Sequence, residues 1–413
     1  MAAFYENYRK YLDALKGDYT KIAKLDFLNP DGSIAFTVDN AAHGPRRGAL
    51  LQEGSLTCNF QNGTRRTASV VLSNLDDAYS YNVNNLWFGQ NIRLSEGLIL
   101  PDGTEFYIPQ GVFAIMDPNE DLRPGRKTAT LNLVDKWAYL DGTLFGNLDG
   151  IYEVPVGSNI YTVISSVLAL GRGNGYPVDG VTPIFTTYYN GKTQTLPNGS
   201  SVALTTTPYT LRVDSDDGTY ADIILGLNDM LVGVIGYDTT GRLRLEPSQD
   251  DLNDGDKEVL WNFTPDEKQF LGATYTVLNS QTYNDIIVQG ETQDNYAQPK
   301  GRAQNTNPRS DLSIYGALGL RTKRISAAGY ATDRQCADRA AWELKQNCIL
   351  KKSVTIESGQ IFHIQENKLV TIERTDKPGS PIERHLVTGF SRPIGQTGSM
   401  TINATSVDDI TTS

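Results

Sequence analysis

The stretch between Thr332 and Arg374 constrains the fold most, because its periodicity changes from that of a helix to that of strands. Its first four residues, TDRQ, match a capping box, in which a hydroxyl residue is followed three positions later by Gln. Mostly small residues then recur at helical spacing: Cys336, Ala337, Ala340, Ala341, Leu344 and Cys348. We therefore predict a helix over residues 332–348 whose alanine-rich face, which includes Ala340 and Ala341, packs closely against a sheet.

Strand periodicity follows this helix to the end of the chain. Val354 and Ile356 alternate with polar residues, and further apolar segments follow at residues 369–372, 386–390 and 400–404. Such alternation indicates half-buried strands. We expect the helix to pack on the antiparallel β-structure that these strands form.

The first 142 residues combine a helical pattern with a series of short strand patterns. Aromatic and aliphatic residues recur at helical spacing over residues 3–16, at Phe4, Tyr8, Tyr11, Leu12 and Leu15. This amphipathic helix either packs on the chain's own barrel or docks on a neighbouring subunit. Over residues 20–142, alternating segments are separated by turn sequences such as Asn62-Gly63 and predict a small antiparallel barrel or sandwich.

The composition changes after Gly142, where two helical patterns follow Ser158 and Thr219, residues that can cap them. A chain of 413 residues exceeds the usual size of one core. We predict an N-terminal helix (1–17), a first β-barrel domain (18–142), an inserted α/β domain (143–262) and a second β-barrel domain (263–413) with helix 332–348 packed on it. Residues 292–312 are expected to form a long loop. No exact internal repeat is found, although residues 20–142 and 263–405 are both β-rich and similar in size.

The net charge of −11, without a basic cluster, argues against sequence-independent nucleic-acid binding, which requires Lys and Arg to neutralise phosphates. The N-terminus lacks the basic and apolar segments of a signal peptide. The most apolar run, residues 223–235, carries Asn228 and Asp229 and is too short to span a bilayer, so no membrane segment is expected.

The residue types that carry out most enzyme chemistry form no recognisable pattern here. His43, His363 and His385 show no metal-ligand spacing, and Cys58, Cys336 and Cys348 are expected to be reduced, buried thiols. The acidic run at Asp250, Asp251, Asp254 and Asp256 lacks the spacing of a calcium loop and is interpreted as a solvated turn. Residues 171–175, GRGNG, follow a helix and are interpreted as its end. We expect no catalytic residue, no metal and no cofactor.

Several strings of this sequence resemble the baseplate hub proteins of bacteriophage tails, a family related in fold to the hubs of contractile-tail spikes and type VI secretion spikes. The strings, in the family's order, are YIPQGVF (107–113), LNLVDKW (131–137) and LDG (140–142), VIGY (234–237) with DTTGRLRL (238–245), NDIIVQG (284–290), DRQCADRAAWEL (333–344) and HIQEN (363–367). Together they cover most of the chain.

The resemblance implies a mainly β chain with two tail-tube-like antiparallel β-barrels and an inserted α/β domain. It also implies a homotrimer in which six barrels form a pseudo-sixfold ring that joins the tail tube to the tip and lines the DNA ejection channel. Expected partners are distal tail or tail tube proteins, the tape measure protein and tip fibre or spike proteins. The protein would then be a structural part of the virion tail tip, assembled in the bacterial host cytoplasm.

Two other functions stay open at the level of sequence. The chain could be a related structural component, either the distal tail ring or a receptor-binding part of the tail. A cell-wall-degrading tail enzyme is the third interpretation, against which the lack of a recognisable catalytic cluster counts. If the ring surrounds a channel, we expect part of the acidic excess to face the passing DNA, since a basic lining would retain phosphates.

Overall fold

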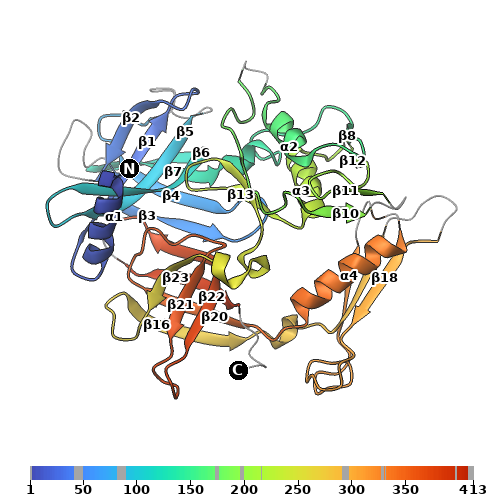
Figure 1. Cartoon of the computed structure of the whole chain (residues 1–413). Helices are drawn as coiled ribbons and strands as arrows, with labels where there is room; N and C mark the ends of the chain where they lie inside the picture. The colour runs from blue at the N-terminus through green and yellow to red at the C-terminus, as the bar shows by residue number, and fades with distance from the viewer. Residues whose placement is uncertain are drawn as a thin grey trace.

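A thirteen-stranded, largely antiparallel sheet forms the frame of the molecule (Figure 1). The computed structural model describes residues 2–40, 50–80, 90–172, 176–195, 200–214, 216–290, 297–326, 330, 332–395 and 398–407. Along this main sheet the strands follow the order β16-β20-β23-β22-β3-β4-β7-β6-β5-β1-β2, with β21 paired to β22 and β15 paired to β21. The predicted fold class, mainly β with an α/β insertion, is confirmed. Closure of either β-rich part into a barrel stays a prediction, since the pairings of the described residues follow one open path.

Two separate parts of the sequence supply the strands of the main sheet. The first β region contains β1 (Thr20–Leu28), β2 (Ile34–Asp39), β3 (Leu50–Asn59), β4 (Arg66–Ser73), β5 (Asn91–Ile99), β6 (Glu105–Arg123) and β7 (Arg126–Asp135). The second β region contains β15 (Val259–Phe263), β16 (Phe270–Val277), β20 (Lys352–Ser358), β21 (Leu369–Glu373), β22 (Ile382–Pro393) and β23 (Met400–Ser406). The two regions meet where β22 pairs with β3.

One hydrophobic core lies against both β regions. Burial alternates along β4, where Ala68, Val70 and Leu72 face the core, as the two-residue period of a strand requires. Phe390 and Ile402 of the second β region belong to the same core. The two β regions are therefore packed against each other over shared apolar contacts, while the predicted domain boundaries stay a prediction.

The N-terminal helix α1 (Ala2–Leu15) covers this core at the left of Figure 1. Tyr11 and Leu15 are completely buried in it, and Tyr8 and Leu12 pack against it. Of the two alternatives left open by the sequence, the apolar face of α1 takes the first and packs on its own chain. Phe4 and Tyr5, at the beginning of the helix, are exposed.

The described part of the inserted region contains two α-helices and seven short strands and has a core of its own. Its elements are β8 (Tyr152–Val154), α2 (Ile160–Leu168), β9 (Ile184–Phe185), β10 (Thr193–Thr195), β11 (Ser201–Ala203), β12 (Leu211–Val213), α3 (Tyr220–Leu231), β13 (Val234–Tyr237) and β14 (Leu243–Glu246). Thr219 caps α3 in a capping box with Asp222. The cap of α2 is Asn159 rather than Ser158, because the Ser158 hydroxyl donates to the carbonyl of Pro155 instead.

The helix predicted over residues 332–348 is α4 (Asp333–Asn347), and its capping box of Thr332 and Gln335 is formed. The prediction that it packs on the closing strands is wrong. It packs instead on a separate three-stranded sheet of β17 (Asp285–Gln289), β18 (Lys300–Gln304) and β19 (Thr322–Ser326), and together these elements form the α4 unit. The receiving sheet was missed because β18 lies in the polar stretch predicted to be a loop.

The face that α4 buries also differs from the predicted face. Cys336, Ala340 and Glu343 are buried, whereas Ala337 and Ala341 are exposed. Close approach depends on Gly301 of β18, where a Cβ atom would lie 2.1 Å from the backbone nitrogen of Ala337. The buried face of α4 therefore includes Ala340 but not the neighbouring Ala341.

Candidate functional site at the junction of the three regions

The segment of residues 363–367, which joins β20 to β21, lies where the two β regions and the inserted region meet. His363, Ile364, Glu366 and Asn367 are buried. Three of these residues make polar contacts with parts of the chain that are more than a hundred residues away. This buried junction is the most distinctive group of polar residues in the described structure.

Glu366 is the centre of the junction. Its carboxylate forms an ion pair with the guanidinium group of Arg66 and a second, at 3.4 Å, with that of Arg65. The thiol of Cys58 donates to the same carboxylate over 3.2 Å. Burial favours the neutral form, but the charges of Arg66 and Arg65 outweigh burial and lower the pKa of Glu366. The carboxylate is thus held ionised between two strands of the first β region.

Arg65 and Arg66 reach the inserted region as well as Glu366. One guanidinium nitrogen of Arg66 donates to the carbonyl of Tyr237 at the end of β13, over 2.5 Å. The backbone of β13 can approach this closely because Gly236 has no side chain: a Cβ atom there would lie 2.3 Å from Nε of Arg65. The two arginines therefore connect three regions through one carboxylate and one carbonyl.

Asp135 fixes the backbone of the two arginines. Its carboxylate accepts hydrogen bonds from the backbone nitrogens of Arg65 (2.7 Å) and Arg66 (3.0 Å), and from that of Trp137 (3.1 Å). Asp135 is also the cap of the short 3-10 helix Lys136–Tyr139 that leads into the inserted region. The string LNLVDKW therefore contains the residue that orients the junction.

Asn367 holds the segment by which the chain leaves the inserted region. Its amide donates to Glu246 (2.9 Å) and to the carbonyl of Pro247 (3.0 Å), and its oxygen accepts from the backbone of Gln249 (3.0 Å). The residue adopts a left-handed conformation with φ of 55°, which Asn tolerates better than most side chains. Asn367 thus connects this segment to the C-terminal end of the inserted region.

His363 connects α1 to the second β region. The hydroxyl of Tyr11 lies 3.0 Å from Nδ1 of His363 and also accepts from the backbone nitrogen of Phe362, while Nε2 lies 3.1 Å from the carbonyl of Leu260. A neutral ring with its proton on Nε2 satisfies these contacts. Burial lowers the pKa of His363 to about 4.

A second buried ion pair joins the two β regions. Arg392 of β22 and Glu96 of β5 have fully buried side chains and lie 2.9 Å apart. Arg392 also donates to the side chain of Gln110 in β6, within the string YIPQGVF. Buried charges in pairs of this kind fix the relative position of strands, because removal of one partner leaves the other desolvated.

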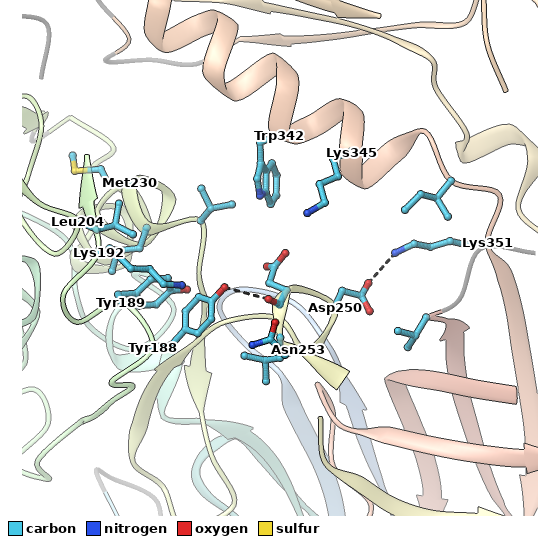
Figure 2. A pocket seen from close by; sticks show the side chains of 16 residues that line it. Tyr188, Tyr189, Lys192, Leu204, Met230, Asp250, Asn253, Trp342, Lys345 and Lys351 are labelled. Atoms are coloured by element: carbon cyan, nitrogen blue, oxygen red, sulfur yellow. Dashed lines mark hydrogen bonds and ion pairs between the residues drawn. The ribbon is translucent and has the colours of Figure 1, made fainter. Parts of the chain in front are cut away.

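A cleft of about 560 Å³ opens between the inserted region and α4 (Figure 2). Tyr188 and Lys192 line one wall, and Trp342 and Lys345 of α4 line the other. Asp250 lies between them and forms an ion pair with Lys351 at 2.8 Å. The acidic run at residues 250–256 is therefore not simply a solvated turn, since its first residue connects the end of the inserted region to the second β region.

Of the His and Cys residues considered from sequence, His363 and Cys58 both lie at the buried junction, whereas Cys336 lies in the α4 unit and His385 is buried in β22. Cys58 and Cys336 are buried and Cys348 is half-buried, whereas His43 lies outside the described residues. Burial raises the pKa of the Cys58 thiol, and the neighbouring Glu366 raises it further. Among the described residues, no group of three or more His, Cys, Asp or Glu side chains could hold a metal ion. No helix in the described part of the chain is long and apolar enough to cross a membrane.

Comparison with known proteins gives matches in structure alone. No family model and no curated protein sequence matches this chain. The tail protein from Neisseria meningitidis MC58 is similar with a TM-score of 0.56 at 9% identity, and the match covers 94% of this chain and 97% of that one. The 43 kDa tail protein of prophage MuSo2 from Shewanella oneidensis gives a TM-score of 0.53 at 11% identity, over 93% and 98% of the two chains.

A third solved structure, prophage tail protein gp18 from Listeria monocytogenes EGD-e, gives a TM-score of 0.52 at 9% identity, with 95% of each chain covered. All three matches run through both β regions, the inserted region and the α4 unit, because they cover nearly the whole chain. At these identities the likeness concerns the fold. The chain therefore has the fold of phage and prophage tail proteins, in agreement with the resemblance of its sequence strings.

Proposed function

We propose that this chain is a structural hub of a phage tail tip or baseplate, a ring of three copies that joins the tail tube to the tip. The observation that supports this proposal most is the likeness to three tail proteins over at least 93% of this chain and 95% of each of theirs. The match extends over nearly the whole of each chain, so it concerns the arrangement of the two β regions, the inserted region and the α4 unit together.

The arrangement of the two β regions supports the proposed ring of three chains. A component that joins a six-fold tube to a three-fold tip needs two similar tube-contacting parts in every chain. Here the two β regions lie side by side in one sheet and share one core (Figure 1). Three such chains would supply six β regions around a channel.

The chemistry of the buried junction supports a structural role rather than an enzymatic one. Both oxygens of the Glu366 carboxylate are occupied by arginine or thiol partners, and the carboxylate is buried. The described residues that line the cleft of Figure 2 include no His, Cys or Ser that could act as a nucleophile with its base. The buried junction therefore holds the two β regions and the inserted region together.

In this proposal the protein belongs to the virion tail tip and is assembled in the bacterial cytoplasm. Its ring would contact distal tail or tube proteins on one side and tip fibre or spike proteins on the other, with the tape measure protein in the channel. The ejected DNA would pass without specific binding, and the net charge of −11 supports a channel that does not retain phosphates.

Native mass spectrometry of the purified chain, alone and with the tail proteins encoded beside it, tests the proposal. We expect particles of three chains, each of 45.4 kDa. A six-chain ring would favour the distal tail ring instead, and a chain that stays monomeric under all these conditions would overturn the hub.

A further inference from the structure

The connection between β18 and β19 contains an apolar loop that the proposed hub does not explain. Residues 314–320, IYGALGL, include no charged side chain and lie within the connection of residues 305–321. Tyr315 is 75% exposed and Leu320 is 59% exposed. Figure 1 shows this connection at the lower right, below β18. An exposed apolar segment of this kind indicates a surface that meets a partner.

The 314–320 loop has a defined shape, because hydrogen bonds hold it at both ends. The backbone nitrogen of Ile314 donates to the carbonyl of Asn305 over 2.9 Å. At the other end, the side-chain amide of Asn284 donates to the carbonyl of Gly319 over 2.6 Å, and its oxygen accepts from the backbone nitrogen of Arg321 over 2.8 Å. The exposed apolar side chains are therefore presented at a fixed place on the α4 unit.

Basic residues gather around this loop, although the whole chain has a net charge of −11. Residues 300–324 contain six basic side chains and one acidic side chain: Lys300, Arg302, Arg309, Arg321, Lys323 and Arg324 against Asp311. They form no run in the sequence, because they are dispersed over two strands and the loop between them. Strand pairing places Arg302 and Arg324 on either side of Ile287 in β17, on the face of the sheet opposite to α4.

Three of the guanidinium groups are not compensated by a carboxylate. Arg302 and Lys323 form ion pairs with acidic residues of the α4 unit. Arg309, Arg321 and Arg324 form no ion pair with any residue in the part of the chain that the structure describes, and Arg309 and Arg324 are exposed. The local positive charge beside the apolar loop favours an anionic partner.

We propose that the 314–320 loop and the three uncompensated arginines contact the surface of an anionic lipid membrane. Tyr315 and Leu320 enter the interfacial layer, where aromatic and apolar side chains are stabilised. The arginines lie at the level of the lipid phosphates, which attract basic side chains close to the bilayer. A loop of this length does not span the hydrocarbon core, so the contact is with one face of the membrane.

The combination of an apolar tip and adjacent cations favours a membrane over a nucleic acid or an acidic protein. A bilayer presents its negative charge directly above hydrocarbon, so one surface satisfies both groups. Nucleic acid would neutralise the arginines but would leave the side chain of Leu320 in water. This inference goes beyond the proposed hub, because it concerns the surface of a single chain and does not depend on the number of chains in the particle.

Co-sedimentation with lipid vesicles tests the membrane contact on the full chain. We expect the protein to bind vesicles of equal parts phosphatidylglycerol and phosphatidylcholine, and to bind less as the salt concentration rises, because exposed charges are screened. Vesicles of phosphatidylcholine alone should bind it at least about tenfold more weakly, since each arginine contributes about fivefold at an anionic surface. Inorganic phosphate at constant ionic strength should not release the protein, whereas it would do so if the arginines bound a free phosphate ion.

Two double variants separate the apolar contribution from the contribution of charge. Tyr315→Ser with Leu320→Ser should weaken binding to the mixed vesicles about tenfold. Arg309→Gln with Arg324→Gln should weaken it about thirtyfold. All four residues are exposed, so both variants should unfold thermally as the unmodified chain does, which circular dichroism checks.

Tyr5→Ser with Arg9→Gln is the matched control, because it removes one exposed tyrosine and one exposed arginine from α1, where Tyr5 is 63% exposed. This variant should bind the mixed vesicles as the unmodified chain does. An unmodified chain that does not bind, or equal losses of binding in the control and the loop variants, would overturn the membrane contact. Capture of another tail protein by the loop without binding to vesicles would overturn it as well. A three-chain particle that leaves the vesicles unbound would overturn the membrane contact alone and leave the proposed hub standing.

Discussion

The main sheet and the α4 unit both consist of strands with a helix packed on them, but the two bodies are held together very differently. The core of the main sheet extends through α1 and both β regions and is crossed by the buried ion pairs of Glu366 and Arg392. The core of the α4 unit consists of Ile286, Val288, Cys336 and Ala340. A helix packed on strands thus belongs to a large core in the main sheet and to a small core in the α4 unit.

This difference indicates how stability is distributed over the molecule. A body that buries few apolar residues opens at a lower free energy than the body it is attached to. We expect the α4 unit to unfold locally while the main sheet stays folded. The main sheet is the part that would contact the tail tube in the proposed hub. Its rigidity depends on the buried ion pairs of Glu366 and Arg392, which lie outside the α4 unit.

The largest effect is expected at the buried junction. Glu366→Gln removes the charge that compensates Arg66 and Arg65, and it should lower the free energy of unfolding of the main sheet by about 3–5 kcal/mol. Urea unfolding followed by tryptophan fluorescence at pH 7.5 measures this loss. Glu53→Gln is the control, since Glu53 pairs with Arg126 at 2.8 Å where both side chains are half-exposed, and its loss should stay below about 1 kcal/mol. Similar losses of unfolding free energy for Glu366→Gln and Glu53→Gln would contradict the view that the buried ion pair stabilises the main sheet more than a surface ion pair does.

A smaller effect is expected in the α4 unit. Ala340→Leu introduces three carbon atoms at a completely buried position and should destabilise this unit by about 2 kcal/mol through overpacking. Hydrogen exchange measured by mass spectrometry should show faster exchange in residues 285–289 and 333–347, with unchanged protection in β4 and β7. Ala341→Leu changes the neighbouring exposed residue and should leave all these rates unchanged. Faster exchange throughout the main sheet in Ala340→Leu would show that the two bodies unfold together.

The smallest effect concerns pH and the link between α1 and the main sheet. His363 is neutral in the folded chain with a pKa of about 4, against about 6.5 when unfolded, so its stabilising contribution is complete above pH 6.5 and is lost as the pH falls towards 4. Between pH 7.5 and 5.5 this loss amounts to about 1.3 kcal/mol.

His363→Gln removes the titrating group, and the variant should lose correspondingly less stability than the unmodified chain over the same interval. Chemical unfolding of both proteins at the two pH values gives the difference directly. Parallel losses in the two proteins would contradict the buried, neutral state of His363.

Local features of the fold were predictable from the sequence because they depend on residues that are close together in the chain. The capping box predicted at Thr332 needs only a hydroxyl and a side chain three positions later, and it is formed. Thr219, predicted as a helix cap, also caps its helix. The alternating segments predicted over residues 20–142 likewise correspond to strands, and in β4 the alternation places Ala68, Val70 and Leu72 on the buried face. The position of α4 was predicted correctly, but its buried face was wrong at Ala341, because Ala340 and Ala341 fit a small-residue stripe equally well.

The buried junction could not be predicted, because it depends on contacts between distant residues. Arg66 and Glu366 are separated by 300 positions, and no local pattern marks either residue as buried. The pairing of β22 with β3 also joins residues from opposite ends of the chain, so no short stretch of sequence contains both partners.

Image averages of the purified particle by electron cryomicroscopy test the central claim most directly, since they report the symmetry of the particle and the presence of a channel. The account predicts a ring with three-fold symmetry and six similar lobes around an open channel. A ring of six chains, or a three-chain particle without a channel, would contradict it.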